Sequence, residues 1–347
     1  MATILVTGGA GFIGSHTVLG LLGAGHTVVV LDSFVNSSLH SLVRVAQLAG
    51  PSAAIRLSVV EGDIRVASDL QRAFSSVPSG AVVDAVIHLA GLKAVDDSCR
   101  NPVHYWDVNV RGSLQLLAAM RAYSCRTILF SSTAALYGVP SQVPTPETSP
   151  IKPVSVYGYS KAAVERLLVG LAENEHSWRL ASLRYFNAVG AHPSGIIGEA
   201  SLKTSGNLFP SLSQVASGRR DKLVVFGDDW PTGDGSCIRD YIHVMDLADA
   251  QIAVMEWLMS GGSQFAAVNL GTGLGNSVFQ VRDAYEAVSR RSLPYEVHPR
   301  RLGDVAKSIA DPSLAAQRFG WHAKRTLAEC CRDSWSWQIA NPYGFAS

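Results

Sequence analysis

The chain has 347 residues, of which 47% are hydrophobic and 16% are charged, so it can bury a large core and general disorder is excluded. Its 29 Lys and Arg residues nearly balance its 28 Asp and Glu residues, and its densest basic runs, "GRRDK" and "PRRLGD", are short. Runs of that length are typical of solvated surfaces, so we expect no nucleic-acid partner.

The N-terminal sequence "MATILVTGG" starts a strand pattern almost at once. This leaves no room for the charged and apolar regions of a signal peptide. No apolar run approaches the ~18 residues of a membrane-spanning helix. The five cysteines form no C-x-x-C pair and no zinc-site spacing. We therefore expect a cytoplasmic protein with reduced, mostly buried cysteines, no membrane contact and no metal site.

Short apolar segments alternate with helical patterns through the first half of the chain. The segments are rich in β-branched residues and end in Gly, Asp or Ser, which is typical of buried parallel strands. They span residues 3–8, 26–32, 57–63, 84–91 and 126–132. Two of the helical patterns cover residues 105–123 and 157 to about 174. This alternation predicts an α/β fold with a Rossmann-type, doubly wound parallel sheet that binds ligands at the carboxyl ends of its strands.

The pattern changes in the second half, where Gly, Pro, Asn and Ser separate shorter elements. We expect residues 1–187 to form the cofactor-binding domain and residues 188–347 to form mainly a smaller, mixed α/β C-terminal lobe. Some segments of that lobe are expected to return to the first sheet.

The stretch "ILVTGGAGFIGSH" follows the first predicted strand and opens a helix. Gly8, Gly11 and Gly14 give G-x-x-G-x-x-G, and Gly9 extends this to G-x-G-x-x-G. Such glycines permit a tight turn, a close backbone approach to a pyrophosphate and close packing of helix on strand. The helix that starts near Phe12 would hold the pyrophosphate at its positive end.

Asp32 ends the second predicted strand at about the ~20-residue distance that this fingerprint requires. Its carboxylate can accept hydrogen bonds from an adenosine ribose and would repel a 2′-phosphate. Ser33, Phe34 and Val35 supply no basic residue for such a phosphate. The sequence therefore favours NAD over NADP.

The stretch "SVYGYSKAAVERLL" contains two tyrosines ahead of Lys161. Positions four apart share a helix face, so Tyr157 aligns with Lys161 and Tyr159 does not. A nearby ammonium and an oxidised nicotinamide would stabilise a Tyr157 phenolate, which could then act as a base. Upstream, "LFSSTAALYG" places hydroxyl residues at the end of a strand; Tyr137 in the same stretch is a competitor for Tyr157 but has no basic partner at helical spacing.

Together, these motifs resemble the extended short-chain dehydrogenase/reductase family over nearly the whole chain. The resemblance includes "VTGGAGFIGSH", "VIHLAGLKAV", "FSSTAALYG", "YGYSK", "LRYFNAVGAHPSG", "IRDYIHVMDLADA" and "NLGTG". The second-half motifs are most similar to those of nucleotide-sugar 4-epimerases. The resemblance implies an isomerase that interconverts UDP-glucose and UDP-galactose by C4 oxidation, rotation of the 4-keto sugar and re-reduction with tightly bound NAD.

The resemblance also implies roles for individual residues. Thr133, Tyr157 and Lys161 match the catalytic group. The implied cofactor contacts are Gly8, Gly11, Phe12, Ile13, Gly14, Asp32, Asn36, Ser37, Asp63, Ile64, Leu89, Ala90, Gly91, Lys93, Asn109, Ser131, Tyr157, Lys161 and Tyr185. The implied contacts with the UDP-hexose are Lys93, Thr133, Tyr157, Asn187, Asn207, Leu208, Leu223, Val224, Phe226, Arg239, Tyr241, Arg301 and Asp304. By analogy with relatives, the helical segments 105–123 and 157–174 are expected to form a homodimer interface.

The sequence leaves several related functions to be weighed. A sugar 4,6-dehydratase needs an Asp-Glu pair after the catalytic Thr, and this chain has Ala134 and Ala135 there, which disfavours dehydration. A 4-epimerase that acts on a UDP-uronic acid or a UDP-pentose stays open. A non-catalytic NAD-binding protein is disfavoured, because the Tyr, the Lys and the hydroxyl residue are all present. The small Ser308 leaves N-acetylated UDP-sugars open as substrates. Tyr159, Ala188 and Leu302 depart from the family pattern without removing a proposed catalytic group.

Overall fold

The computed structural model describes residues 1–200, 206–301 and 303–345, so Leu302 lies outside the described residues. The chain divides into two compact units. Unit 1 contains residues 1–138, 150–185 and 248–268, and unit 2 contains residues 139–149, 186–247 and 269–347. The predicted domain limits, 1–187 and 188–347, stay a prediction.

Unit 1 is built on a seven-stranded sheet with the order β10-β6-β5-β4-β1-β2-β3. The neighbours from β6 to β3 pair in parallel, which confirms the predicted Rossmann-like fold. The strands are β1 (Thr3–Thr7), β2 (Thr27–Asp32), β3 (Leu57–Glu61), β4 (Ala85–His88), β5 (Thr127–Thr133), β6 (Arg179–Tyr185) and β10 (Phe265–Leu270).

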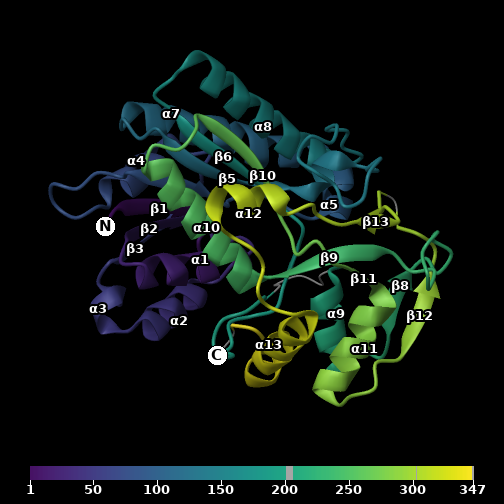
Figure 1. Cartoon of the computed structure of the whole chain (residues 1–347). Coiled ribbons are helices and arrows are strands. Elements are labelled where there is room, and N and C mark those ends of the chain that lie inside the picture. Colours follow the sequence, from purple (N-terminus) through teal and green to yellow (C-terminus); the bar gives the residue numbers. More distant parts are fainter. Residues whose placement is uncertain (201–205, 302, 346–347) are drawn as a thin grey trace. The chain divides into compact units, whose positions relative to one another are not determined.

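Helices cover both faces of this sheet, and Figure 1 shows α7 and α8 on one side of β5 and β6 and α1 and α10 on the other. The helices are α1 (Phe12–Gly23), α2 (Leu39–Ala49), α3 (Pro51–Ala54), α4 (Ala67–Ser75), α5 (Val95–Arg100), α6 (Pro102–Trp106), α7 (Gly112–Ala122), α8 (Val156–Asn174) and α10 (Val244–Met259). A π-helical segment, η1 (Asp107–Arg111), and a 3₁₀ turn, η2 (Ala134–Tyr137), complete the unit.

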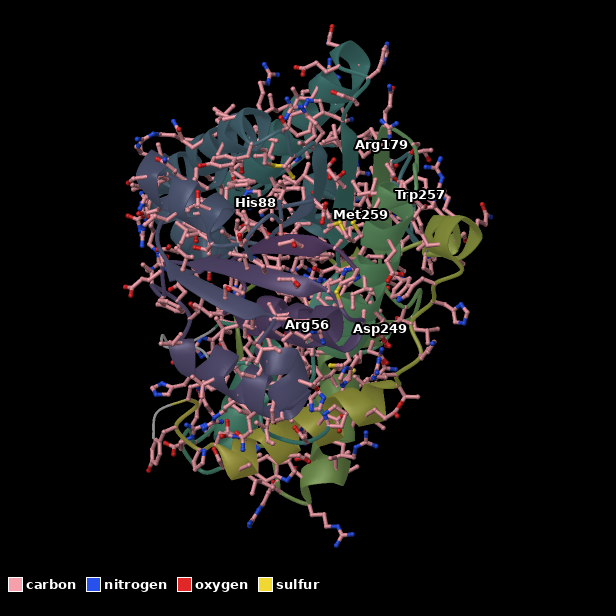
Figure 2. All side chains as sticks on the ribbon, turned by 90° about the vertical axis from the view of Figure 1, so that its left-hand side faces the viewer. Arg56, His88, Arg179, Asp249, Trp257 and Met259 are labelled. Carbon is pink, nitrogen blue, oxygen red and sulfur yellow. The ribbon has the colours of Figure 1, made fainter. Side chains whose placement is uncertain are left out.

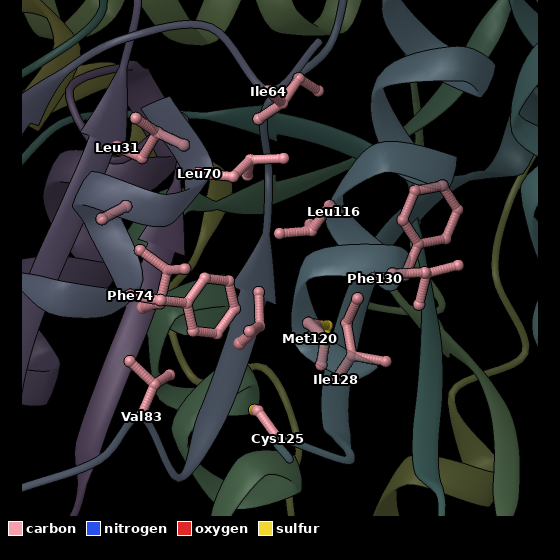
Figure 3. Packing of buried hydrophobic residues seen from close by; sticks show 14 of the residues in the cluster. Leu31, Ile64, Leu70, Phe74, Val83, Leu116, Met120, Cys125, Ile128 and Phe130 are labelled. Carbon is pink, nitrogen blue, oxygen red and sulfur yellow. The ribbon is translucent and has the colours of Figure 1, made fainter. Parts of the chain in front are cut away.

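One hydrophobic core of unit 1 lies between the sheet and helices α4, α7 and α8 (Figure 3). Phe74 of α4 and Met120 of α7 pack there with Ile128 and Phe130 of β5, and all four are at most 3% exposed. Burying side chains of this size contributes about 1.5–3 kcal/mol each. Because the strands from β6 to β3 run parallel, their carboxyl ends meet at one edge of the sheet.

The third strand differs from the sequence-based prediction. It ends at Glu61 rather than at residue 63, and Val59 is 38% exposed. The reason is that β3 pairs only with β2 and forms an edge of the sheet. The predicted helix over residues 105–123 also differs, because it is divided into α6, η1 and α7.

Unit 2 contains two small sheets. The first has the order β11-β9-β13, with β7 also paired to β9, and the second pairs β12 with β8. Its strands are β7 (Asn187–Val189), β8 (Leu223–Phe226), β9 (Ile238–His243), β11 (Gly275–Ser277), β12 (Tyr295–His298) and β13 (Lys307–Ser308). Its helices are α9 (Leu208–Ala216), α11 (Val278–Ser289), α12 (Ser313–Phe319) and α13 (Leu327–Ala340).

Capping residues define the helix starts in unit 2. Ser277 and Gln280 form a capping box at the start of α11, and Thr326 and Glu329 form another at α13. Each box satisfies two backbone N–H groups that the first helical turn leaves unpaired. The two helices then pack around Tyr285, which is fully buried in the core of this unit.

Candidate active site

The glycine loop joins β1 to α1 with very little free space. A Cβ atom at Gly8 would lie 2.6 Å from the Ala90 backbone nitrogen, and one at Gly14 would lie 2.2 Å from the Gly8 carbonyl oxygen. Gly8 also has a φ of +73°, which favours glycine. Gly11 is the N-cap of α1, and no side chain caps the first N–H groups of that helix. Such a helix end attracts a phosphate.

Asp32, at the end of β2, organises the backbone around this loop. Its Oδ2 accepts a hydrogen bond from the Ala10 N–H at 2.9 Å. Its Oδ1 accepts from the Phe34 N–H at 2.9 Å and from the Ser37 hydroxyl at 2.8 Å. A carboxylate has about four acceptor sites, so one site is left for a ribose hydroxyl.

Asp63 has partners that the sequence-based prediction missed. Arg65 donates to both of its carboxylate oxygens, at distances of 2.6–3.1 Å. The same guanidinium donates to Asp107 Oδ2 at 2.6 Å. Arg65 lowers the pKa of the Asp63 carboxyl group, chiefly through its hydrogen bonds. The predicted cofactor contact of Asp63 would therefore be made by a carboxylate that Arg65 already orients.

Asn109 lies in the π-helical segment and fixes the loop after β4. It is 2% exposed, and its Oδ1 accepts from the Leu92 N–H at 2.8 Å. Its Nδ2 donates to Leu92 O and to Ser160 Oγ, both at 3.0 Å. Ser160 in turn donates to Tyr157 O at 2.8 Å. π-Helical turns often mark functional positions because they redirect a side chain.

His88, which is labelled in Figure 2, extends this buried hydrogen-bonded network to Thr7, where the glycine loop begins. Its Nδ1 lies 2.7 Å from Thr7 Oγ1, and its Nε2 lies 2.9 Å from Ser113 Oγ. The Ser113 hydroxyl donates to the Asn109 carbonyl oxygen, so its oxygen accepts from His88 Nε2–H. Burial, with a smaller effect of the charge on Lys161, lowers the pKa of His88 to about 3. His88 is therefore neutral, and no motif in the sequence had indicated this role.

The predicted catalytic residues of unit 1 lie together. Tyr157 and Lys161 are on one face of α8, while Tyr159 is 52% exposed. Desolvation raises the pKa of the Tyr157 hydroxyl group, and the Thr133 side chain has a smaller effect that lowers it. Thr133 Oγ1 also accepts a hydrogen bond from the Ala135 N–H at 3.1 Å. Lys161 is 4% exposed and donates to Ser131 O at 2.9 Å.

The other predicted cofactor contacts follow the ends of strands or open α1. Two of them offer limited contact: Ile64 is 5% exposed and packs in the core, and Tyr185 is 8% exposed. The remaining ones are Phe12 and Ile13 at the start of α1, Asn36 after β2, and Leu89, Ala90, Gly91 and Lys93 after β4.

The predicted nucleotide-sugar residues of unit 2 form two groups. In the first, Arg239 donates to Val305 O at 2.7 Å and lies 3.4 Å from Asp304 Oδ1. Tyr241, on the same strand, pairs with Asn187 of β7. Burial raises the pKa of Tyr241 above its ordinary value.

The second group surrounds Phe226. The Arg301 guanidinium carbon lies 4.1 Å from the centre of the Phe226 ring, and Arg301 donates to Gly206 O at 3.3 Å. Asn207 and Leu208 start α9, and Val224 lies in the same strand as Phe226. Leu223 does not join the group through its side chain, which is 1% exposed and packs in the core.

Two general expectations can be compared with the described residues. No helix among them is long and apolar enough to cross a membrane. Within the same residues, no cluster of three or more His, Cys, Asp or Glu side chains could hold a metal ion. Cys125, Cys330 and Cys331 are buried, whereas Cys99 is exposed, and all five cysteines are free.

The parallel sheet, the glycine cradle and the adjacent Thr, Tyr and Lys side chains define a dinucleotide-dependent protein of the short-chain dehydrogenase/reductase type. A model of the NAD dependent epimerase/dehydratase family matches residues 4–271. The chain belongs to this family.

Individual relatives are similar over almost the full chain. UDP-glucose 4-epimerase 4 from Oryza sativa subsp. japonica is 46% identical over 345 residues, which cover 99% of this chain and 92% of the relative. A bifunctional UDP-glucose 4-epimerase and UDP-xylose 4-epimerase from Arabidopsis thaliana is 44% identical over 343 residues, which cover 99% and 97%. The crystal structure of UDP-glucose 4-epimerase from Bifidobacterium longum in complex with NAD+ and UDP has a TM-score of 0.93 and 40% identity, covering 99% of this chain and 100% of that chain.

Proposed function

We propose that this protein is an isomerase that interconverts UDP-glucose and UDP-galactose. It oxidises the sugar at C4, lets the 4-keto sugar turn over, and reduces it on the other face with tightly bound NAD. The observation that carries this proposal is that Tyr157 lies one helical turn from Lys161, whose Nζ donates to Ser131 O on the strand that ends at Thr133, in a chain whose relatives include UDP-glucose 4-epimerases.

The residues of unit 1 fit NAD. The Gly8–Gly14 cradle has no room for side chains, α1 offers its uncapped end to the pyrophosphate, and Asp32 keeps an acceptor site for a ribose hydroxyl. When bound, NAD supplies a nicotinamide that takes a hydride from sugar C4 and later returns it.

Tyr157 is the proposed base for the proton of the sugar 4-hydroxyl group. Desolvation raises its pKa, so the phenolate needs support from its surroundings. The Thr133 side chain lowers the pKa of Tyr157 and so favours the ionised form. Lys161 supplies a positive charge one turn along the helix. Burial lowers the pKa of Lys161 to about 8, and Lys161 is therefore still mainly protonated at neutral pH.

Residues of unit 2 are proposed to hold the UDP part of the substrate. Arg239 and Arg301 have planar guanidinium groups that can grip a diphosphate through two hydrogen bonds each. Phe226 presents an aromatic ring beside Arg301, which is suited to a nucleobase. Strong binding of UDP with few contacts to the hexose would allow the 4-keto sugar to turn over.

The decisive experiment uses the purified protein without added cofactor. UDP-galactose is supplied, and UDP-glucose is measured by chromatography, with Tyr157→Phe as the inactive control. We expect an equilibrium mixture of the two sugars without net reduction of NAD. If the NAD-loaded protein converts neither sugar, the proposal is wrong.

A second substrate class is supported by one relative, whose name includes UDP-xylose 4-epimerase. The same assay with UDP-xylose, and with UDP-N-acetylglucosamine because of the small Ser308, defines the range of sugars. A 4,6-dehydratase activity is disfavoured because Ala134 and Ala135 follow Thr133. No keto-deoxy sugar should therefore accumulate.

The protein is also proposed to act in the cytoplasm as a homodimer. Helices α6, α7 and α8 each expose a large apolar side chain: Trp106 is 43% exposed, Leu114 47% and Tyr159 52%. Trp106 and Tyr159 also line a cavity of about 460 Å³ in unit 1. Exposed apolar surface of this kind favours association. Sedimentation equilibrium should give twice the mass of the chain, and Trp106→Glu should shift the protein toward the monomer.

A further inference from the structure

A buried ion pair lies close to the proposed catalytic residues but has no part in the mechanism above. Arg184 of β6 donates from Nε to Glu165 Oε1 at 3.1 Å and from Nη2 to Glu165 Oε2 at 2.8 Å. The two side chains are 5% and 3% exposed. Taking two charges out of water is costly, and such a pair is weak evidence for a role in stability alone.

Arg184 also forms a hydrogen bond with Tyr137, which the sequence offers as an alternative to Tyr157. Its Nη1 donates to the Tyr137 hydroxyl oxygen at 2.9 Å. Tyr137 therefore does have a basic partner, which helical spacing could not reveal because Arg184 lies 47 residues away on a neighbouring strand. We call Arg184, Glu165 and Tyr137 the arginine cluster.

The arginine cluster joins α8, which carries Tyr157, to η2, the turn that follows Thr133. Glu165 lies on α8, four residues after Lys161 and eight after Tyr157, and therefore on the same helix face. Tyr137 is the last residue of η2, the turn that begins directly after Thr133. A single guanidinium group thus binds both the helix that carries the base and the turn that follows its hydroxyl partner.

The strand register supports this arrangement. Arg184 pairs with Ser132, and the next residue of each strand forms the pair Tyr185 and Thr133. The backbone position of Arg184 is therefore fixed by the same pairing of β5 with β6 that positions Thr133. A bidentate contact fixes both the rotation and the position of Glu165, which a single ammonium group cannot do.

We propose that Arg184 is a positioning residue that, through Glu165 and Tyr137, holds Tyr157 in place relative to Thr133 for proton transfer. This inference rests on the proposed function. Its physical basis is that proton transfer from the substrate to Tyr157 depends steeply on distance, and a misplacement of ~1 Å can cost about 10²-fold in rate.

Two variants probe the arginine cluster with small changes. Tyr137→Phe removes only the hydroxyl acceptor of Arg184, and Arg184→Lys keeps the charge but loses the bidentate contact. We expect kcat for UDP-galactose to fall about tenfold in the first variant and about 10²-fold in the second, with KM little changed. Arg179→Lys is the matched control, because Arg179 lies on the same strand and donates to His176 O and Trp178 O.

A second measurement does not depend on turnover. In the NAD-loaded protein, the ¹³Cζ NMR signal of Tyr157 is assigned by its loss in Tyr157→Phe and then followed with pH. Thr133 lowers the pKa of Tyr157, so both variants of the arginine cluster should raise its apparent pKa, whereas Arg179→Lys should not.

The outcomes separate the two proposals. If the wild-type protein converts no UDP-sugar but the variants still move the Tyr157 signal, the proposed function fails and the positioning role stands. If kcat and the Tyr157 titration stay at wild-type values, the positioning role is wrong. If the variants instead lose their fold or their NAD, the Glu165→Met/Arg184→Met double variant restores apolar packing without charges. Wild-type kcat in that folded variant would overturn the inference, and a lowered kcat with an altered Tyr157 titration would support it.

Discussion

Lys161 donates a hydrogen bond from Nζ to the carbonyl oxygen of Ser131 at 2.9 Å. The same ammonium group lies 4.7 Å from the centre of the Phe130 ring. Strand β5, which ends at Thr133, therefore also holds the charge proposed to favour the Tyr157 phenolate. Because burial lowers the pKa of Lys161 to about 8, that charge is present at neutral pH and is lost as the pH rises through about 8.

The first prediction concerns the alkaline side of the activity profile. The kcat for UDP-galactose should fall as the pH rises above about 8 in the wild-type protein, because Lys161 becomes neutral. Lys161→Met should lower kcat at pH 7 by about 10²-fold or more. Its remaining activity should rise with pH, because Tyr157 must then ionise without the positive charge.

The control is Lys324→Met, which removes an exposed ammonium group and should keep the wild-type profile. A wild-type kcat that stays level up to pH 10 would contradict the assignment of Lys161. Measurements of kcat at saturating substrate, with the NAD content checked at each pH, separate this effect from loss of cofactor.

The second prediction concerns His88 and stability in acid. The pKa of His88 is about 3 in the folded protein against an ordinary value of 6.5. Between these values the unfolded chain binds a proton that the folded chain does not. The contribution of neutral His88 is therefore complete above pH 6.5 and is lost as the pH falls toward 3, at up to about 1.4 kcal/mol per pH unit.

Denaturant unfolding between pH 7 and 4 should show this loss. His88→Gln disturbs the two hydrogen bonds of the His88 ring, so its free energy of unfolding at pH 7 should be lower by about 1–3 kcal/mol. Because the glutamine amide does not take up a proton, this free energy should fall less steeply as the pH is lowered. His40→Gln, which changes an exposed histidine, should keep the wild-type slope. Equal slopes for wild type and His88→Gln would refute the role of His88.

Much of the site could be predicted because its signals are local in the sequence. The glycine spacing, Asp32 at the end of β2 and the four-residue step from Tyr157 to Lys161 each depend on a single turn of structure. The polar partners of these residues could not be predicted in the same way. Arg184 and Tyr137 are 47 residues apart, and His88 and Thr7 are 81 apart.

The misjudged elements have physical explanations of the same kind. The apolar pattern of β3 is that of a central strand, but strand order places it at an edge, and strand order is a property of the whole sheet. Asn109 lies in a π-helical turn inside a segment whose periodicity is that of an ordinary helix.

The third prediction compares two glycines of the same helix. A Cβ atom at Gly14 would lie 2.2 Å from Gly8 O, whereas one at Gly23 would have no atom within 4 Å. Gly14→Ala should destabilise the protein by about 1–3 kcal/mol through overpacking and should abolish NAD retention. Gly23→Ala should retain NAD and be stabilised by up to about 1 kcal/mol, because alanine favours helix.

Co-purified NAD, measured after denaturation, and chemical unfolding test this pair. Retention of NAD at wild-type levels by Gly14→Ala would show that the loop can relax and that the close approach is not required. A loss of NAD in both variants would show that α1 as a whole, rather than its first turn, determines cofactor binding.

The fourth prediction concerns Arg239 in unit 2. Its guanidinium group donates to Val305 O at 2.7 Å and to Ile238 O at 3.0 Å, and it lies 3.4 Å from Asp304. These contacts orient the group before any ligand binds. If Arg239 grips the diphosphate equally in the ground state and the transition state, Arg239→Lys should raise KM for UDP-galactose about tenfold, which corresponds to ~1.4 kcal/mol, with kcat almost unchanged.

The matched control is Arg282→Lys, in the same unit, because Arg282 is paired with Glu286 on α11. Its KM should stay at the wild-type value. Inhibition by UDP supplies an independent measure, because the inhibition constant should rise in Arg239→Lys by the same factor as KM. A fall in kcat with unchanged KM and an unchanged inhibition constant would instead place Arg239 with the reacting sugar. If kcat, KM and the inhibition constant all stay at wild-type values, Arg239 is excluded from the substrate site.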